Sequence, residues 1–483
     1  MNETAVQYRT TQPWRLRLYA ASSGVGNGFG LLMMYVSYIA AGGYGILVAT
    51  VGVILTFTRI FDGITDPIVA LISDRTNTKY GKIRILQWAG WAVMALSCAT
   101  LFIFGVGRGI VFFIIIYLVY ILGYTMYNVA TNIGNMTITN DPKQRPLLAR
   151  WSTIFTMLVM MGGSSVIMAA FLPMFGGEYT NSMLGFTCIF IIVLTAVLNL
   201  IASIAITPAD KPENFTVGMG HEKPISLRDC WHLIKSNRAL QMYTVAAASD
   251  KLALQIAGNT AFNTLLFGVL IGNMGLSTIM SALTMPISLV GAILSTRMAA
   301  RQGSKHALIY WTWFAIIFAG VGVLFYAFFD LSKVFHSIVI TVLFFGLTIL
   351  RNVGQNGASA CGMAMMGDIS DYETSMSGKV MPGTVAACYS FIDKIISSLA
   401  TTIAGFALAA IGYVSVMPQP TDAATPQIRW LVIIMTLCVP MIGWLCTIVA
   451  MKFYPLTKEK MVEVQAKVNE LRESAAEEAP AAE

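Results

Sequence analysis

Two carboxylates lie one helical turn apart inside a long apolar stretch of the sequence. Asp62 and Asp66 stand at positions i and i+4, so a helix would place both on one face. Two acids this close repel each other when both are ionised, and their oxygens suit a proton or a small hard cation. We therefore expect the pair to bind Na⁺ or H⁺, with hydroxyl groups of Thr65 and Thr125 beside it. The alternative is a structural ion pair between Asp62 and Arg59.

Two further acid–base pairs fall in apolar stretches, Asp250-Lys251 and Asp393-Lys394. Adjacent residues on a helix point about 100° apart, so neither pair is expected to be satisfied internally. Two alternatives stay open for Asp250 and Lys251, namely pairing between the two helices and contact with a bound solute. For Lys394 we favour a role in ligand binding or coupling.

Side-chain amides gather in two other apolar stretches, at i, i+4 spacing in each. Such groups suit recognition of a hydroxyl-rich solute, and the alternative is hydrogen bonding between helices. The predicted solute-binding residues of these two stretches are Asn128, Asn132, Arg351, Asn352, Gln355 and Asn356.

The elements that must position these residues are apolar helices. Hydrophobic residues make up 56% of the chain and charged residues 11%, about half the charge of an ordinary soluble domain. A stretch of about 20 apolar residues in a bilayer must be helical, because no water satisfies the backbone there. We predict an all-α integral membrane protein with twelve spans, at 18–40, 44–73, 85–106, 110–138, 151–175, 183–207, 239–271, 276–298, 306–329, 337–366, 385–413 and 428–453.

Lys and Arg concentrate in the connections after the second, fourth, sixth and eighth predicted spans. Because cytoplasmic loops carry the excess of basic residues, both termini are expected to be cytoplasmic. The net charge of +7 reflects this bias, so no nucleic-acid partner is expected. The sequence contains no HExxH, GxSxG or P-loop motif and no cluster of His and Cys, which argues against an enzyme and against a bound cofactor.

The chain divides into two halves that resemble each other. Residues 70–83 match 292–305 at a constant offset of 222. Parallel six-helix repeats are typical of secondary transporters, whose sites lie at the interface of the repeats. At the same offset Asp62 maps to Thr284 and Asp66 maps to Ser288, so only the first half has the acid pair. The predicted parts are an N-terminus (1–17), a first half (18–207), a linker (208–238), a second half (239–453) and a cytoplasmic tail (454–483).

Several segments together resemble one transporter family. Residues 59–84, RIFDGITDPIVALISDRTNTKYGKIR, closely resemble the signature of the glycoside–pentoside–hexuronide:cation symporters, the melibiose-carrier family of the major facilitator superfamily. The resemblance continues at 124–125, 137–145 and 368–373 and at Lys394. These segments span nearly the whole chain in the order of the family, and the first is the most specific.

The resemblance implies a role for each matching residue. Asp62 and Asp66 match the cation-binding carboxylates of the family, and Thr125 matches its cation-site threonine. Thr65 stands where the melibiose carrier has an asparagine, so coupling to Na⁺ and coupling to H⁺ both stay open. Lys394 matches the lysine that contributes to sugar binding and coupling.

The galactoside-binding residues of the melibiose carrier are largely absent. Its two acids fall here on Gly28 and Asn128, its aromatic contacts on Asn132 and Ser359, and its arginine on about Thr153. Melibiose is therefore not the expected substrate. The cationic residues that remain would favour an anionic sugar such as a hexuronide, as one hypothesis.

These expectations together describe a monomeric sugar transporter of a bacterial inner membrane. It would import a glycoside, pentoside or hexuronide by symport with Na⁺ or H⁺, in contact with membrane lipid and with no cofactor besides the coupling ion. The alternative on the same scaffold is a cation symporter for a lysolipid or another amphiphile, which would need a hydrophobic side opening.

Overall fold

The computed structural model describes most of the chain, and the described part is helical with no β-strand. The described residues are 10–75, 81–139, 141, 144–211, 235–334, 336–377 and 382–478. Side chains are described at these positions except 64, 66–75, 136, 145–146, 285, 363–364, 377, 382–384, 386–387, 391 and 471–478. The side chain of Asp66 is thus outside the description, although its backbone belongs to a helix.

The chain separates into two compact units. Unit 1 comprises Met1–Glu222 with Leu408–Thr421, and unit 2 comprises Lys223–Ala407 with Asp422–Glu483. The helices of unit 1 are α1 (Pro13–Tyr19), α2 (Ala21–Met33), α3 (Val36–Tyr44), α4 (Val48–Arg75), α5 (Ile83–Ala99), η1 (Thr100–Phe104), α6 (Gly109–Thr137), α7 (Arg145–Met157), η2 (Leu158–Gly162), α8 (Gly163–Val166), η3 (Ile167–Phe171), α9 (Leu172–Met174) and α10 (Asn181–Ile206).

The remaining helices start in unit 2. They are α12 (Arg238–Ala257), α13 (Thr260–Asn263), η5 (Thr264–Leu270), α14 (Gly275–Gln302), α15 (Ser304–Phe328), η6 (Leu331–Val334), α16 (Ile338–Ser377), α17 (Pro382–Ala410), α18 (Pro426–Ile433), η7 (Ile434–Cys438), α19 (Val439–Phe453) and α20 (Lys458–Glu478).

Nine helices in the described part are long and apolar enough to cross a membrane, and two bent pairs would raise the number to eleven. The bent pairs are Pro13–Met33 with Val36–Tyr44 and Arg238–Ala257 with Thr260–Leu270. Helix α4 is not among them, although its 28 residues would extend about 42 Å, more than a hydrocarbon core. Twelve spans and cytoplasmic termini therefore stay predictions. Large exposed apolar side chains on the spans, such as Leu96 and Val111, fit a lipid-facing surface.

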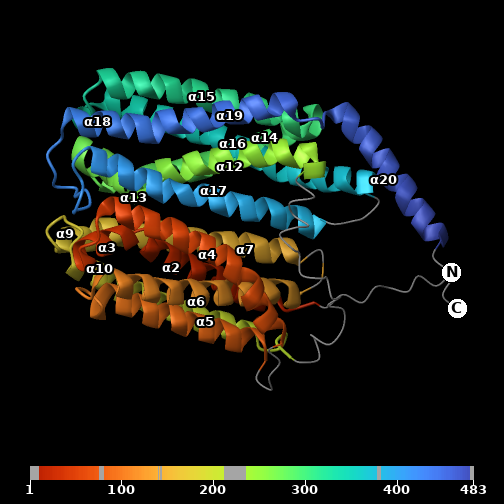
Figure 1. Cartoon of the computed structure of the whole chain (residues 1–483), viewed down its shortest axis with the longest axis horizontal. Helices are drawn as coiled ribbons and strands as arrows, with labels where there is room; N and C mark the ends of the chain where they lie inside the picture. The colour runs from red at the N-terminus through yellow and green to blue at the C-terminus, as the bar shows by residue number, and fades with distance from the viewer. Residues whose placement is uncertain are drawn as a thin grey trace. The chain divides into compact units, whose positions relative to one another are not determined.

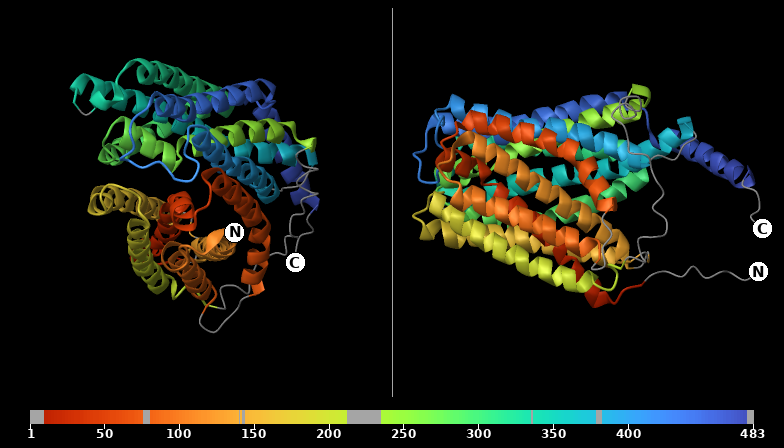
Figure 2. Two further views of the ribbon diagram at one scale, coloured as in Figure 1. Left: turned by 60° about the vertical axis from the view of Figure 1, so that its left-hand side comes forward. Right: turned by 60° about the horizontal axis from the view of Figure 1, so that its bottom comes forward.

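Helices α5 and α6 of unit 1 run side by side in close contact (Figures 1 and 2). Glycines permit this approach, because a Cβ added to Gly90 would lie 2.8 Å from the backbone nitrogen of Tyr127. A Cβ on Gly123 would likewise lie 2.8 Å from a methyl group of Val93. Helix α6 packs on its other side against α4. Unit 1 thus holds α6 firmly beside the helix that carries Asp62 and Asp66.

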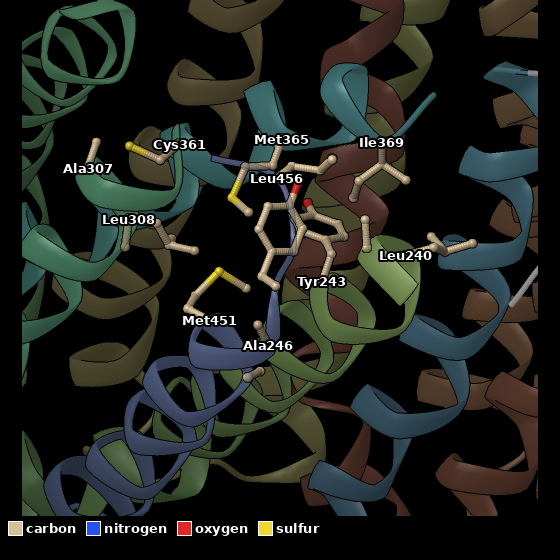
Figure 3. Close-up of a cluster of buried hydrophobic side chains, with 14 of the residues drawn as sticks. Leu240, Tyr243, Ala246, Ala307, Leu308, Cys361, Met365, Ile369, Met451 and Leu456 are labelled. Atoms are coloured by element: carbon tan, nitrogen blue, oxygen red, sulfur yellow. The ribbon is translucent and has the colours of Figure 1, made fainter. Parts of the chain in front are cut away.

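The core of unit 2 is a cluster of buried side chains from α12, α15, α16, α17 and α19, part of which Figure 3 shows. Tyr243 of α12 lies within it, with Leu308 of α15 and Met365 of α16. Helix α16 also packs against α14, where a Cβ on Gly291 would lie 2.7 Å from a methyl group of Val353. Any larger residue at position 291 would push these two helices apart.

The tail helix α20 packs against α16 within unit 2. Val464 and Val468 are buried, and Gln465 donates a hydrogen bond to Asp371 at 2.6 Å. One apolar face of this helix therefore covers the end of α16, as its amphipathic pattern indicates.

Candidate functional site

The predicted cation-binding residues of unit 1 lie on α4 and α6. The Thr125 hydroxyl of α6 donates a hydrogen bond to Asp62 Oδ1 of α4 at 2.9 Å. The Thr65 hydroxyl donates to the backbone carbonyl of Asp62 at 3.1 Å. Both threonines are buried and Asp62 is partly buried. The structure therefore brings three of the four predicted residues together, and the fourth, Asp66, follows one turn later on α4.

Backbone chemistry adds a possible oxygen ligand that sequence reasoning missed. Pro67 has no N–H, so it cannot donate the usual helical hydrogen bond to the carbonyl of Gly63. Gly63 is the residue after Asp62. The signal in the sequence for this carbonyl was the proline four residues after Gly63.

A column of stacked aromatic rings on α6 ends at Tyr124, the residue before Thr125. Phe113, Tyr117, Tyr120 and Tyr124 stack in succession, with ring centroids 5.9, 5.8 and 6.1 Å apart. The first three rings are buried, and the last belongs to the residue before Thr125. The buried, stacked rings give this side of α6 an apolar surface, and electrostatic interactions are stronger in apolar surroundings than in water. Their spacing of i, i+4, i+7 and i+11 was visible in the sequence.

The acid–base pairs of unit 2 meet between α12 and α17. Lys251 of α12 forms an ion pair with Asp393 of α17, as one of the two alternatives predicts. The Tyr389 hydroxyl donates to the other carboxylate oxygen of Asp393 at 3.4 Å. Asp393 is buried, whereas the Lys251 side chain is 46% exposed. The lysine thus neutralises the charge of this carboxylate, and the tyrosine adds a hydrogen bond to it.

A cavity of about 520 Å³ adjoins this ion pair. Asp250, Lys251 and Tyr389 are among its lining residues, and Asp250 Oδ1 is buried with no hydrogen-bond partner among the described residues. Lys394 is partly buried on α17 and does not line this cavity. Its predicted role in ligand binding stays a prediction.

The polar residues that were predicted on α16 lie in two different surroundings. Asn352 and Asn356 line a second cavity, between α14 and α16. Arg351 instead donates hydrogen bonds to the carbonyl of Thr436 at 3.1 Å and to Asn352 Oδ1 at 3.2 Å. Gln355 is partly buried and lines neither cavity. Arg351 therefore does not line this cavity itself, although its guanidinium contacts the amide of one lining asparagine, Asn352.

The two predicted asparagines of α6 belong to unit 1. Asn132 is exposed, and Asn128 is partly buried against α2. A Cβ added to Gly26 of α2 would lie 3.3 Å from Asn128 Oδ1, so the amide contacts that helix. Asn128 therefore also serves the packing of α6 on α2.

Sequence reasoning missed a buried carboxylate that fixes the start of α5. Asp210 is 2% exposed and accepts hydrogen bonds from the backbone N–H groups of Lys82, Ile83 and Arg84 at 2.8, 2.9 and 3.0 Å. The Arg84 guanidinium adds a bond at 3.1 Å. Helix α5 has no capping side chain of its own, and Asp210 takes that role from 128 residues away.

Glycine at position 81 makes this contact possible. Gly81 has φ +102°, and a Cβ there would lie 2.2 Å from Asp210 Oδ2. The signal in the sequence was a helix start at Lys82 with no Ser, Thr, Asp or Asn to cap it. Such a start requires an acceptor from elsewhere in the fold, but the sequence does not indicate which one.

Two solved structures that resemble most of the chain are membrane transporters. The nucleoside transporter NupG has a TM-score of 0.60 at 14% identity, over 92% of this chain and 99% of that one. A bacterial homologue of the iron transporter ferroportin in the inward-facing state has a TM-score of 0.58 at 12% identity, over 91% and 98%. At such identity the likeness shows the fold alone. Together with a family model described as MFS/sugar transport protein, the fold identifies the chain as a membrane transporter of the major facilitator superfamily and not an enzyme.

The family model described as MFS/sugar transport protein matches residues 22–458, and the chain belongs to this family. An isoprimeverose transporter of Lactiplantibacillus pentosus is 24% identical over 467 residues, which cover 94% of this chain and 91% of the relative. A glucuronide carrier protein homolog of Escherichia coli (strain K12) is 24% identical over 472 residues, covering 94% and 95%. The inner membrane symporter YicJ of the same strain is 23% identical over 441 residues, covering 90% and 89%. The predicted membership of the glycoside–pentoside–hexuronide symporters is therefore confirmed.

Proposed function

We propose that the chain is a multi-pass protein of the bacterial inner membrane that imports a sugar or glycoside together with Na⁺ or H⁺. The cation binds at Asp62, Asp66, Thr65 and Thr125. The observation that carries this proposal is the hydrogen bond from Thr125 to Asp62, which joins a carboxylate to a hydroxyl between two packed helices. An ionisable side chain in an apolar helix costs stability, so its retention with polar partners indicates a function.

The chemistry of the group suits a small cation. Carboxylate, hydroxyl and carbonyl oxygens are the ligands that hard ions prefer, and the same carboxylates can accept a proton. Loss of the helical donor at Pro67 leaves the Gly63 carbonyl as one more candidate ligand. Binding of one positive charge would neutralise one of the two carboxylates and reduce their mutual repulsion.

Coupling follows if sugar and cation favour the same conformation. Each ligand shifts a two-state equilibrium only by its differential affinity for the two states. If cation binding favours the state that admits sugar, then sugar binding must favour cation binding by the same factor. Uphill import of the sugar then uses the gradient of the cation.

The sugar would bind polar residues of the second half. Asn352 and Asn356 line one cavity of unit 2, and Asp250 and Lys251 line another. Lys394 would contribute to ligand binding or coupling, as the resemblance implies. Both cavities have polar side chains in their walls, so neither favours the amphiphile alternative.

The proposal is tested by uptake into proteoliposomes. Radiolabelled glycosides, pentosides and uronides are offered under a Na⁺ gradient alone and under a pH gradient alone. One of the two gradients should drive accumulation of at least one sugar above the external concentration, and that gradient identifies the coupling ion.

The matched variants separate the cation site from a general loss of charge. Asp62→Asn should reduce accumulation to the equilibrium level, because the amide cannot bind a cation or a proton in the same way. Asp330→Asn removes a carboxylate from an exposed loop and should leave accumulation unchanged. Concentrative uptake at the wild-type level in Asp62→Asn would contradict the proposal.

A further inference from the structure

A cavity of about 480 Å³ lies between α14 and α16 in unit 2. This volume is in the range of pockets that bind small molecules. Among the described residues that line it, none is charged. The polar lining residues are Ser281, Thr284 and Ser288 of α14 and Asn352, Asn356 and Ser359 of α16. The wall thus offers hydroxyls and amides in an otherwise apolar surrounding.

Two of these hydroxyls are buried without a partner. Thr284 and Ser288 are 9% and 8% exposed, and neither hydroxyl oxygen has a hydrogen-bond partner among the described residues. Helical serines and threonines usually donate to the carbonyl four residues earlier, as Ser281 does to Ser277 at 2.9 Å. A buried polar group left unpaired costs folding free energy, so these two hydroxyls weaken the fold in the ligand-free protein.

Pro286 lies between these two residues and adds a third available group. It has no N–H, so the carbonyl of Ala282 lacks its helical donor on the same stretch of α14. Donors and acceptors are therefore unused on two consecutive turns of one helix. A ligand rich in hydroxyl groups could satisfy both kinds, since each sugar hydroxyl donates and accepts.

The two cations nearest these residues already have protein partners, although Arg351 Nε has none among the described residues. Lys251 pairs with Asp393, and Arg351 donates to the carbonyl of Thr436 and to Asn352 Oδ1. An anionic sugar in the cavity would therefore have to lose the hydration of its carboxylate next to neutral side chains. That loss is costly, whereas a neutral hydroxyl at the same place would need only one hydrogen bond.

We infer that Thr284 and Ser288 bind hydroxyl groups of an uncharged sugar in the cavity between α14 and α16. This inference rests on the proposed function and narrows it, because it selects neutral glycosides and pentosides over hexuronides. The two residues are those that stand at the offset of 222 from Asp62 and Asp66. The second half thus uses the same two helix positions for a neutral ligand.

The test removes each hydroxyl and keeps the shape of the side chain. Thr284→Val and Ser288→Ala should each raise the KM for a neutral sugar about 10-fold, the usual effect of losing one hydrogen bond to a ligand. Because the hydroxyls have no protein partner, these changes should not lower the melting temperature of the ligand-free protein. Thr284→Ser retains the hydroxyl and should keep a KM near that of the wild type.

The control is another threonine of the same helix. The Thr278 hydroxyl is also buried and unpartnered among the described residues, but Thr278 does not line this cavity. Thr278→Val should therefore leave KM unchanged. An equal effect of Thr278→Val and Thr284→Val would overturn the inference, because it would assign the effect to the helix and not to the cavity.

Matched sugar pairs test the charge of the ligand. The probes are methyl β-D-glucoside with methyl β-D-glucuronide and methyl β-D-galactoside with methyl β-D-galacturonide, together with methyl β-D-xyloside. Uptake of a neutral probe at least 10-fold faster than uptake of any uronide supports the inference. Preference for a uronide, or wild-type KM in both Thr284→Val and Ser288→Ala, overturns it. These outcomes leave the proposed function intact as long as Asp62→Asn still abolishes accumulation.

Discussion

Helices α4 and α14 carry the same pair of positions with opposite chemistry. In unit 1 these positions are Asp62 and Asp66, and a hydroxyl from α6, that of Thr125, donates to Asp62 at 2.9 Å. In unit 2 they are Thr284 and Ser288, whose hydroxyls have no partner among the described residues and which line a cavity beside α16. The first pair is acidic, and its Asp62 is hydrogen-bonded across helices; the second pair is neutral, with no hydrogen-bond partner among the described residues.

Equivalent positions on two helices can therefore carry side chains that suit different ligands. Both pairs occupy i and i+4 of a 28-residue helix, so the backbone presents two side chains to one face in each unit. Oxygen atoms with negative charge suit a cation, whereas hydroxyls suit an uncharged sugar. In our account a change of two side chains assigns the cation to one half and the sugar to the other.

The strongest test of this difference replaces the acid pair of α4 with the side chains found at the same positions of α14. The double change Asp62→Thr with Asp66→Ser should abolish cation-driven accumulation, a fall of about 100-fold or more, because no carboxylate remains to bind the ion. Equilibration of sugar down its own gradient should persist. Both quantities are measured by uptake of the transported sugar into proteoliposomes, with and without a cation gradient. Cation-driven accumulation at the wild-type level in the double variant would show that the carboxylates of α4 do not bind the coupling ion.

A second difference concerns the helix that follows each of these two. Gly81 and Gly303 both have positive φ, at +102° and +93°. In unit 1 the buried Asp210 caps α5 by accepting hydrogen bonds from three backbone N–H groups. In unit 2 Asp368 accepts a single hydrogen bond among the described residues, from the Ser304 hydroxyl at 3.2 Å. The same turn is therefore fixed much more firmly in the first half.

Asp210→Ala should accordingly destabilise the protein more than Asp368→Ala does. Removal of Asp210 leaves three backbone donors and a guanidinium without their acceptor, at a cost of about 3 kcal/mol. Removal of Asp368 breaks one hydrogen bond, at a cost of about 1 kcal/mol. Thermal unfolding of the purified variants in detergent measures both costs. Equal melting temperatures for the two variants would show that the turn is fixed alike in both halves.

The substitution Thr125→Val tests whether the hydrogen bond between α6 and α4 contributes to binding of the coupling ion. The valine keeps the shape of the side chain and removes the hydroxyl that donates to Asp62. The concentration of coupling ion that gives half-maximal uptake should rise about 10-fold, the usual effect of losing a hydrogen bond to a charged group. Thr137→Val is the matched control, since the Thr137 hydroxyl donates to the carbonyl of Ile133, one turn earlier on its own helix. An unchanged ion requirement in Thr125→Val would exclude Thr125 from the site.

Apolar periodicity was sufficient to predict most of the helices. The expected spans at 110–138, 183–207 and 306–329 correspond closely to Gly109–Thr137, Asn181–Ile206 and Ser304–Phe328. The expected span at 239–271 is broken instead, because Gly258 ends α12 and Asn259 caps the next helix by accepting from the N–H of Ala261. A glycine followed by an asparagine is a local signal, so this break was predictable in principle.

The candidate site was predictable only in part. Asp62, Thr65 and Thr125 could be named because the family motif and the helical spacing both pointed to them. The cap that Asp210 provides depends on residues 128 positions apart, and no local pattern identifies that partner. The cavity beside Thr284 likewise depends on how α14 and α16 pack, which their sequences do not specify one by one.

The most direct test measures sugar affinity with and without the coupling ion, in the wild type and in Asp62→Asn. Sugar binding to purified protein is followed by calorimetry, with the transported sugar and the ion that drives its uptake. Our account predicts that the ion tightens sugar binding to the wild type, that sugar tightens ion binding by the same factor, and that Asp62→Asn abolishes both effects. Sugar binding to Asp62→Asn that still responds to the ion as in the wild type would contradict the account.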